Sequence, residues 1–190
     1  AFKGCSNVKS LVLEDGGGVL RLSYYNNDYE SPFYSCPLDS LYLGRNLSYS
    51  NTSTSARPFR DKTKLRSVVI GDSVTSVDSY AFYGCSSLGN VSKGNKVTSI
   101  GEYSFYNCKA LTSLSFIAGI TNIPSYAFAG CIGLTDVKVP SSVTGIGNHA
   151  FNGCTGLTSV SIPQSVGSIG YRAFKGCSNV KSLVLEDGGG

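Results

Sequence analysis

Phenylalanine recurs along this chain at intervals that a non-repetitive domain would not produce. A motif close to Ala-Phe-x-Gly-Cys is repeated, and its phenylalanines are Phe2, Phe33, Phe59, Phe82, Phe105, Phe128, Phe151 and Phe174. The intervals between them are 31, 26 and then five times 23 residues. A fixed period of this length is the signature of a repeat architecture in which each repeat stacks on its neighbours. The sequence therefore predicts one solenoid domain over residues 1–190.

A longer repeat is superimposed on this period. Residues 1–18 recur without change as residues 173–190. Eighteen identical residues indicate a recent duplication of a whole block, so we expect a longer array of which these 190 residues are a fragment. Exposed rungs at the two ends would then favour end-to-end self-association.

The apolar positions within each repeat describe one coil of the solenoid. Counted from each motif phenylalanine, positions +6, +9, +11, +15 and +18 are mostly Leu, Val or Ile. The alternation at +9 and +11 predicts a short strand with one buried face, and +15 to +18 a second extended piece. Position +2 is most often Gly, which predicts a left-handed turn after a single helical turn. Stacked coils would bury one continuous core.

The order L-x-x-L-x-L followed by a tight coil is the pattern of a leucine-rich repeat. Its form here, clearest from Val139-Pro140 to Val160 and from Ile162-Pro163 to Cys177, resembles the Treponema-type repeat of the BspA-like bacterial surface proteins. The resemblance implies an α/β repeat solenoid of about eight 23-residue rungs, curved and right-handed, with short parallel strands on the concave face and very little helix. It also implies an exported, surface-attached, adhesin-like protein.

Two segments near the N-terminal end depart from the repeat and are interpreted as inserts. Residues 14–32 are longer than the period requires, and Val19–Tyr25 within them predicts a strand that pairs back as a hairpin. Residues 44–57 are polar and rich in Ser and Thr, which predicts a surface loop. Insertions in solenoids cluster on one face and often carry the binding site.

Composition excludes several other classes of protein. Apolar residues make up 41%, charged residues 15%, and the net charge is +4. These values argue against charge-driven disorder and against a coiled coil. No apolar run approaches the ~18 residues of a transmembrane segment. The mild positive charge permits acidic partners, but the chain has no nucleic-acid-binding motif, so we predict no nucleic-acid partner.

The seven cysteines all occupy position +3 from a motif phenylalanine. One inward cysteine per rung is most simply a small buried hydrophobe with a free thiol. Disulfides between adjacent rungs are the alternative, because the rung spacing suits the Cα separation but the side chains point the same way. Neighbouring cysteines are too far apart in sequence for zinc. We expect no metal site and no cofactor.

No catalytic constellation emerges, so we predict that the chain is not an enzyme. The single histidine, His149, shares its repeat position with Tyr80, Tyr103, Tyr126 and Arg172, which indicates one member of a polar-tipped outer row. A lone row residue does not build a Ser-His-Asp triad. Asn26–Glu30 offers five consecutive oxygen-bearing side chains without calcium-loop spacing, so a plain insert loop and a weak calcium site are both kept as interpretations.

The candidate ligand contacts are a basic run and exposed tyrosines. Five basic residues fall within ten positions, and Lys62 stands where other rungs have the buried Cys. Because an unpaired buried ammonium is costly, we expect this turn to open outward. The run is interpreted either as a solvated surface or as a patch for acidic glycan, phosphate or protein. The predicted binding residues are Tyr24, Tyr25, Tyr29, Tyr42, Arg57, Arg60, Lys62, Lys64 and Arg66.

Together with what the resemblance implies, these observations favour a non-enzymatic binding and adhesion module of a bacterial cell-surface or secreted protein. Its ligand would be a protein or glycan of a host or neighbouring cell. The outward strand positions are small and polar, with Tyr42 as the one large anchor, so the inserts are better binding candidates than the regular rungs. The alternative is a passive spacer that projects other domains from the cell surface.

Overall fold

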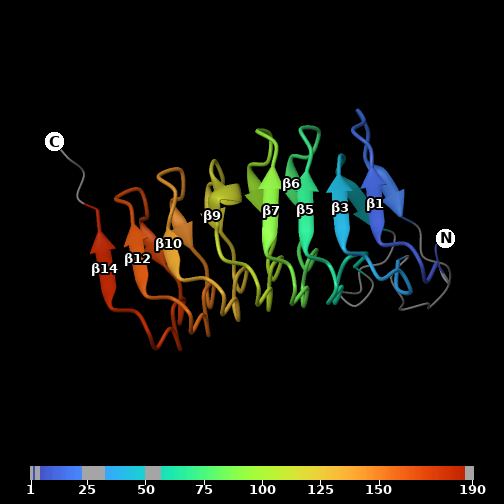
Figure 1. The fold of residues 1–190 in the computed structure, drawn as a ribbon. Helices are drawn as coiled ribbons and strands as arrows, with labels where there is room; N and C mark the ends of the chain where they lie inside the picture. The colour runs from blue at the N-terminus through green and yellow to red at the C-terminus, as the bar shows by residue number, and fades with distance from the viewer. Residues whose placement is uncertain (1, 3–4, 23–32, 50–56, 187–190) are drawn as a thin grey trace.

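The computed structural model describes residues 2, 5–22, 33–49 and 57–186, and the predicted leucine-rich-repeat solenoid is confirmed. The chain coils into an elongated body with one strand of successive coils in a row along its length (Figure 1). We call this row the long-strand face. Its strands are β1 (Ser10–Leu13), β3 (Ser40–Leu43), β5 (Ser67–Ile70), β7 (Asn90–Lys93), β10 (Asp136–Lys138), β12 (Ser159–Ile162) and β14 (Ser182–Leu185).

All strand pairs in this row are parallel, as the sequence predicts. β1, β3, β5 and β7 form one sheet, and β10, β12 and β14 form another. Equivalent repeat positions lie opposite each other, so that Leu41 pairs with Val68 and Leu43 with Ile70. These inward side chains are at most 5% exposed, whereas Val69 between them is 44% exposed. The period-two pattern thus buries one face of each strand and exposes the other.

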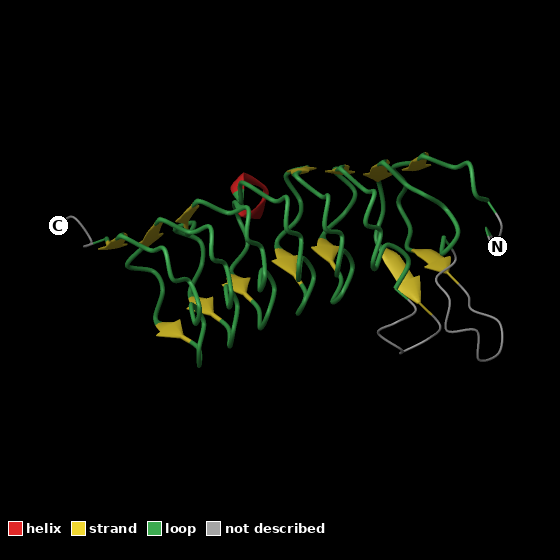
Figure 2. Cartoon of the chain, turned by 60° about the horizontal axis from the view of Figure 1, so that its bottom comes forward, coloured by secondary structure: helices red, strands yellow, loops and turns green. Residues whose placement is uncertain are grey.

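A second row of shorter strands lies on another side of the coil (Figure 2). These strands occupy the second extended piece of the repeat and also pair in parallel. They are β2 (Leu20–Leu22), β4 (Leu47–Tyr49), β6 (Ser76–Val77), β8 (Ser99–Ile100), β9 (Asn122–Ile123), β11 (Gly145–Ile146) and β13 (Ser168–Ile169).

Phenylalanine and cysteine form two ladders through the core. The rings of successive motif phenylalanines stack at centroid distances of 5.0–5.9 Å, from Phe2 to Phe174. From Cys85 onward, each motif thiol donates to the carbonyl of the phenylalanine one rung back, at 3.0–3.2 Å. All seven cysteines are free, in agreement with the first interpretation. From Cys85 onward, each rung therefore donates the same thiol hydrogen bond to the rung before it.

The predicted hairpin after β1 is wrong. β2 pairs with β4 instead, in parallel, with Leu20 opposite Leu47. β3 pairs with one edge of β1, and parallel stacking of β2 on β4 keeps Leu20 and Leu22 half-buried. The strand that pairs with β2, β4, lies within residues 44–57, where the sequence predicts a surface loop. Residues 50–56 lie outside the described residues.

The long-strand face is interrupted where the sequence predicts a strand at Leu114 and Phe116. The 3-10 helix η2 (Ser115–Ile117) stands there, and within the described residues it is the one helix (Figure 2). Four other rungs have Gly or Pro at the position of Ile117, namely Gly71, Gly94, Pro140 and Pro163, and the first and last have Glu14 and Glu186. Ile117 and Phe116 are both buried, at 0% and 5% exposed. A strand would place consecutive side chains on opposite faces, so burying both requires a tighter turn.

Candidate functional site

The most distinctive surface of the solenoid is a set of stacked aromatic rings outside the core. We call it the aromatic ledge, and it consists of Tyr80, Tyr83, Tyr103, Tyr106, Tyr126 and His149. One row runs from Tyr80 through Tyr103 and Tyr126 to His149, with centroids 4.5–4.8 Å apart and ring planes within 7°. Tyr83 and Tyr106 form a parallel second row at 4.7 Å. The rung spacing of a parallel solenoid sets these distances.

The first row of the ledge is built on left-handed backbone. Tyr80, Tyr103, Tyr126 and His149 have φ between 55° and 61°, and Arg172 continues the series at 55°. Large side chains seldom adopt this region, at a cost of about 1 kcal/mol or more per residue. The turn directs each backbone N–H to a carbonyl of the next rung, as from Tyr80 to Glu102 at 2.9 Å. The predicted outer row is thus confirmed, and its conformation is regular.

The stacking determines which parts of the rings are available. Because the ring faces cover each other, the edges of the rings are turned outward. At one end, the Arg60 guanidinium lies 4.2 Å from the Tyr83 ring centroid and 6.0 Å from that of Tyr80. At the other end, Tyr171 packs edge-on to His149. The ledge therefore presents phenol edges and an arginine, and few open ring faces.

Burial also favours the neutral form of two phenols of the ledge, Tyr83 and Tyr103. Partial burial raises the pKa of Tyr83, and partial burial followed by the neighbouring Tyr126 raises the pKa of Tyr103. A neutral phenol both donates and accepts hydrogen bonds. The ledge thus offers amphipathic contacts at physiological pH.

The structure divides the predicted basic run among different environments. Arg60 joins the aromatic ledge. Lys64 and Arg66 line a hollow of about 830 Å³ together with Lys9 and Asp39, and Arg66 forms an ion pair with Asp39 at 3.1 Å. Arg57 is half-buried. The run is therefore not one continuous basic patch.

The expectation that Lys62 opens outward is wrong. Lys62 is 8% exposed, and its ammonium donates to the carbonyls of Phe33, of Tyr34 at 2.8 Å and of Cys36 at 3.4 Å. Burial lowers the pKa of Lys62. The ammonium takes the place of the thiol ladder and reaches the same phenylalanine carbonyl. Because three carbonyls surround it, burial is tolerated.

Of the predicted tyrosines, Tyr42 is the one within the described residues. The hydroxyl of Tyr42, on β3, hydrogen-bonds to the Asp15 carboxylate, and this bond raises the pKa of Tyr42. Tyr24, Tyr25 and Tyr29 lie outside the described residues, as does the possible calcium ligand run 26–30. Groups of three or more potential metal ligands are absent from the residues that the structure describes.

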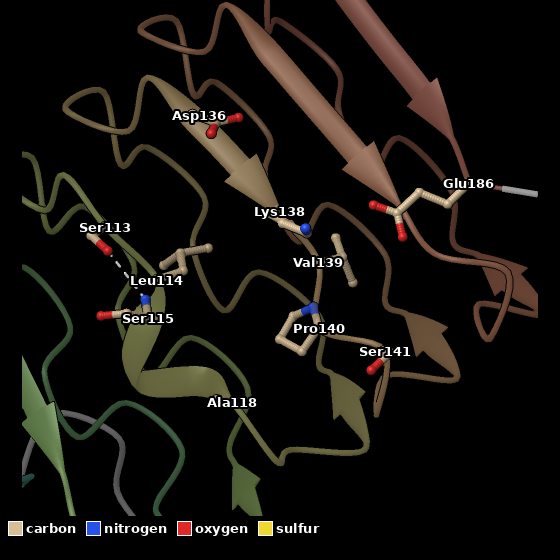
Figure 3. A pocket seen from close by; sticks show the side chains of 10 residues that line it. All are labelled: Ser113, Leu114, Ser115, Ala118, Asp136, Lys138, Val139, Pro140, Ser141 and Glu186. Atoms are coloured by element: carbon tan, nitrogen blue, oxygen red, sulfur yellow. Dashed lines mark hydrogen bonds between the residues drawn. The ribbon is translucent and has the colours of Figure 1, made fainter.

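A second hollow, of about 520 Å³, lies where η2 interrupts the long-strand face (Figure 3). Ser113, Asp136, Lys138 and Glu186 contribute polar groups to its lining. The sequence does not predict this hollow directly, although Ile117 stands where four other rungs have Gly or Pro. The contact of Arg60 with the ledge is not predictable either, since no repeat position indicates it.

Neither histidine nor cysteine is arranged for catalysis within the described residues. The Nδ1 atom of His149 is 3.0 Å from the Asn152 amide nitrogen, and its ring is part of the stack. Burial raises the pKa of Cys85 and Cys154 to about 12, and it also raises the pKa of Cys108 and Cys131 well above the ordinary value of a thiol. These thiols are therefore protonated and unreactive near neutral pH.

Comparison with solved structures supports the same architecture. A leucine-rich cell surface protein from Faecalibacterium prausnitzii A2-165 matches with a TM-score of 0.66 and 21% identity, over 98% of this chain and 62% of its own. The leucine-rich repeat protein of T. pallidum matches with a TM-score of 0.64 and 24% identity, over 91% of this chain and 73% of its own. This chain thus spans less than two thirds of the first of these proteins.

Two other comparisons bear on identity. Curated proteins give no match to the chain. None of the helices in the described part of the chain has the length and apolarity to span a membrane. The family model of the BspA type leucine-rich repeat region matches residues 52–181, in six copies. This match covers more than half of the sequence and coincides with the stacked Phe and Cys ladders. The chain therefore belongs to the BspA-type leucine-rich repeat family.

Proposed function

We propose that this chain is a non-enzymatic binding module of a bacterial cell-surface or secreted protein, and that it adheres to a protein through the aromatic ledge. The observation that carries the proposal is the array of Tyr side chains beside Arg60. Tyr and Arg are the residue types most enriched in the energetically dominant parts of protein interfaces. The rings are held by their neighbours, so little side-chain entropy is lost on binding.

The geometry favours a protein over a glycan as the ligand. A sugar ring stacks on the open face of an aromatic side chain, whereas the faces in the ledge stack on each other at 4.5–4.8 Å. Phenol edges and hydroxyls suit the mixed polar and apolar surface of a protein. We propose the cell-surface location because the similar F. prausnitzii protein is described as a cell surface protein.

The test is a binding screen of the folded chain against purified extracellular matrix proteins and a glycan array. The ledge variant carries Tyr103→Asn and Tyr106→Asn, because Asn tolerates the left-handed backbone at Tyr103. The matched control is Tyr34→Asn, which removes a 64% exposed tyrosine outside the ledge. We expect the ledge variant to lose at least about tenfold in affinity for a matrix protein and the control to keep it.

Other outcomes contradict the proposal. Binding to glycans alone, unaffected by the ledge variant, would move recognition away from the ledge. A salt-sensitive interaction lost on charge reversal of Lys64 and Arg66 would place recognition at their hollow instead. A folded chain that binds nothing in the panel would favour the passive spacer.

A further inference from the structure

The break in the long-strand face leaves one edge of β10 open in the interior of the solenoid. Elsewhere, successive rungs exchange backbone hydrogen bonds along this face, as from the Ser159 N–H to the Thr135 carbonyl at 3.4 Å. Within the described residues, no backbone hydrogen bond reaches the edge of β10 that faces η2. Stacked rungs lie on both sides of this edge (Figure 1), so a local interruption of the repeat opens it.

The rung that contains η2 satisfies its own polar groups. The Ile117 N–H donates to the Leu114 carbonyl at 2.9 Å, and the Ala118 N–H donates to the Ser115 carbonyl at 3.4 Å. The Ser115 N–H donates to Ser113 Oγ at 3.2 Å. A strand would offer its polar groups to both neighbouring rungs, whereas this rung turns them back on itself. The second hollow lies between this rung and β10 as a result (Figure 3).

Two residues of β10 direct their backbone toward the second hollow. Successive residues of a strand turn their N–H and C=O groups to opposite edges. The Thr135 carbonyl and the Val139 N–H both bond to β12. The backbone groups of Asp136 and Lys138 therefore face the other way, and both residues line the hollow. A row of unpaired N–H and C=O groups is a template for another strand.

We propose that this edge binds an extended segment of a protein ligand as an added parallel strand, with a basic residue opposite Asp136 and an acidic residue opposite Lys138. An extended backbone supplies the alternating donors and acceptors that the edge lacks. Both side chains are exposed, and opposite charges across a strand pair are favourable. The hollow of about 520 Å³ is within the ~300–1,000 Å³ of typical ligand sites. The site is separate from the aromatic ledge and does not depend on its function.

The charges around the hollow favour a protein segment over an acidic glycan. The Asp136 carboxylate accepts a hydrogen bond from Ser159 Oγ, and the Glu186 carboxylate accepts one from Ser161 Oγ at 2.5 Å. Both carboxylates would repel a polyanion. Among the described residues, no ion pair engages Lys138. A segment with one charge of each sign, two positions apart, matches this arrangement.

The test titrates the full chain, labelled with ¹⁵N, with the peptide acetyl-Thr-Val-Lys-Val-Glu-Val-Thr-amide up to millimolar concentration. We expect the largest amide shifts at Asp136 and Lys138. In the parallel register, the valine between the two charges donates its N–H to the Asp136 carbonyl. Methylation of that peptide nitrogen should weaken binding at least about fivefold. Methylation of the glutamate nitrogen, which faces away from β10, is the matched control and should change the affinity little.

A charge swap tests the register. Asp136→Lys with Lys138→Glu should weaken binding of this peptide at least about fourfold and favour the peptide in which Lys and Glu are exchanged. Ser67→Lys with Val69→Glu makes the same change on β5, whose two edges are both paired, and should leave the affinity unchanged. Circular dichroism checks that both variants are folded.

Three results would overturn the added strand. One is the absence of amide shifts at Asp136 and Lys138 at millimolar peptide. Another is a swapped variant that keeps the original preference. The third is a sulfated oligosaccharide that shifts these two amides more strongly than the peptide does. Shifts confined to the aromatic ledge would also count against this site while leaving the ledge as the binding surface, so the two proposals fail separately.

Discussion

The rungs from residue 81 onward and the rungs between residues 33 and 66 satisfy the same backbone in different ways. In the regular rungs, the carbonyl of the motif cysteine accepts the N–H of the leucine three residues later, as from Leu88 to Cys85 at 2.9 Å. In the earlier rung, Leu38 follows Cys36 by two residues, and the intervening Pro37 has no N–H. The shortened turn cannot make this bond.

The next rung compensates for the shortened turn. Lys62 replaces the motif cysteine there, and its ammonium reaches the Cys36 carbonyl as well as those of Phe33 and Tyr34. A thiol has one weak donor, whereas an ammonium has three strong ones. The difference teaches that a deviation in one coil of a solenoid is corrected by the coil stacked on it, because rungs interact with their nearest neighbours.

Alkaline pH should destabilise the regular rungs first, and this loss of unfolding free energy is the largest effect that we expect. A thiol with a raised pKa in the folded state contributes full stability below its unfolded pKa, 9.0, and loses it as pH rises toward about 12. Cys85, Cys108, Cys131 and Cys154 together should lose roughly 5 kcal/mol of unfolding free energy by about pH 10. Urea unfolding under reducing conditions at neutral pH and at about pH 10 measures it.

The control is a variant with Cys85→Ala and Cys154→Ala, whose loss of stability with pH should be about half as steep. Lys62 acts with the opposite sign, because its lowered pKa makes the folded state bind fewer protons than the unfolded chain as pH approaches 10.5. A urea midpoint that does not change between the two pH values would contradict the thiol ladder.

Replacing Lys62 by Met should destabilise the irregular rungs by about 1–3 kcal/mol. Met keeps the length and apolar stem of the side chain but leaves the Cys36 and Tyr34 carbonyls without the ammonium donor. Lys62→Cys, which restores the repeat residue, should also destabilise, because a thiol reaches the Phe33 carbonyl alone. Thermal unfolding measures both variants. Lys64→Met, at an exposed neighbouring position, should stay within about 0.5 kcal/mol of the unmodified chain. A more stable Lys62→Met variant would refute the compensation.

The sequence could predict those parts of the fold that the period repeats. Position +9 (+8 in the shortened rung of Leu41) is apolar in every rung; Leu41, Val68, Leu114, Val137 and Val160 are buried there and Val91 is half-buried, so the solenoid and its core follow from counting. The pairing of β2 with β4 could not be found by counting, because the inserts change the spacing between these strands.

The candidate site was predictable to a smaller extent. The recurrence of Tyr at one repeat position indicated an outer row, and the stack from Tyr80 to His149 agrees with it. Closeness in sequence leaves the basic run open to two interpretations, a solvated surface and one patch for an acidic ligand. A tight coil sends adjacent side chains to different sides, so Arg60, Lys62 and Lys64 face the ledge, the core and solvent respectively.

The smallest expected effect concerns the break between β7 and β10. Substituting Phe116→Val, Ile117→Pro, Ala118→Ser and Gly119→Ser copies the residues of the following rung, Val139 to Ser142. Removal of the Ile117 side chain should allow a strand to form and join the two sheets. The ladder hydrogen bonds gained offset the apolar burial lost, so we expect stability to change by less than about 1.5 kcal/mol.

Hydrogen exchange separates this outcome from a merely tolerated substitution. A new strand would protect amides at residues 114–116 and along the edges of β7 and β10, and the hollow beside Lys138 would close (Figure 3). Ile117→Val is the matched control, because it keeps a buried apolar side chain at the break and should leave exchange unchanged. If the four substitutions also leave exchange unchanged, the break is imposed by the flanking rungs, and Ile117 is only accommodated there.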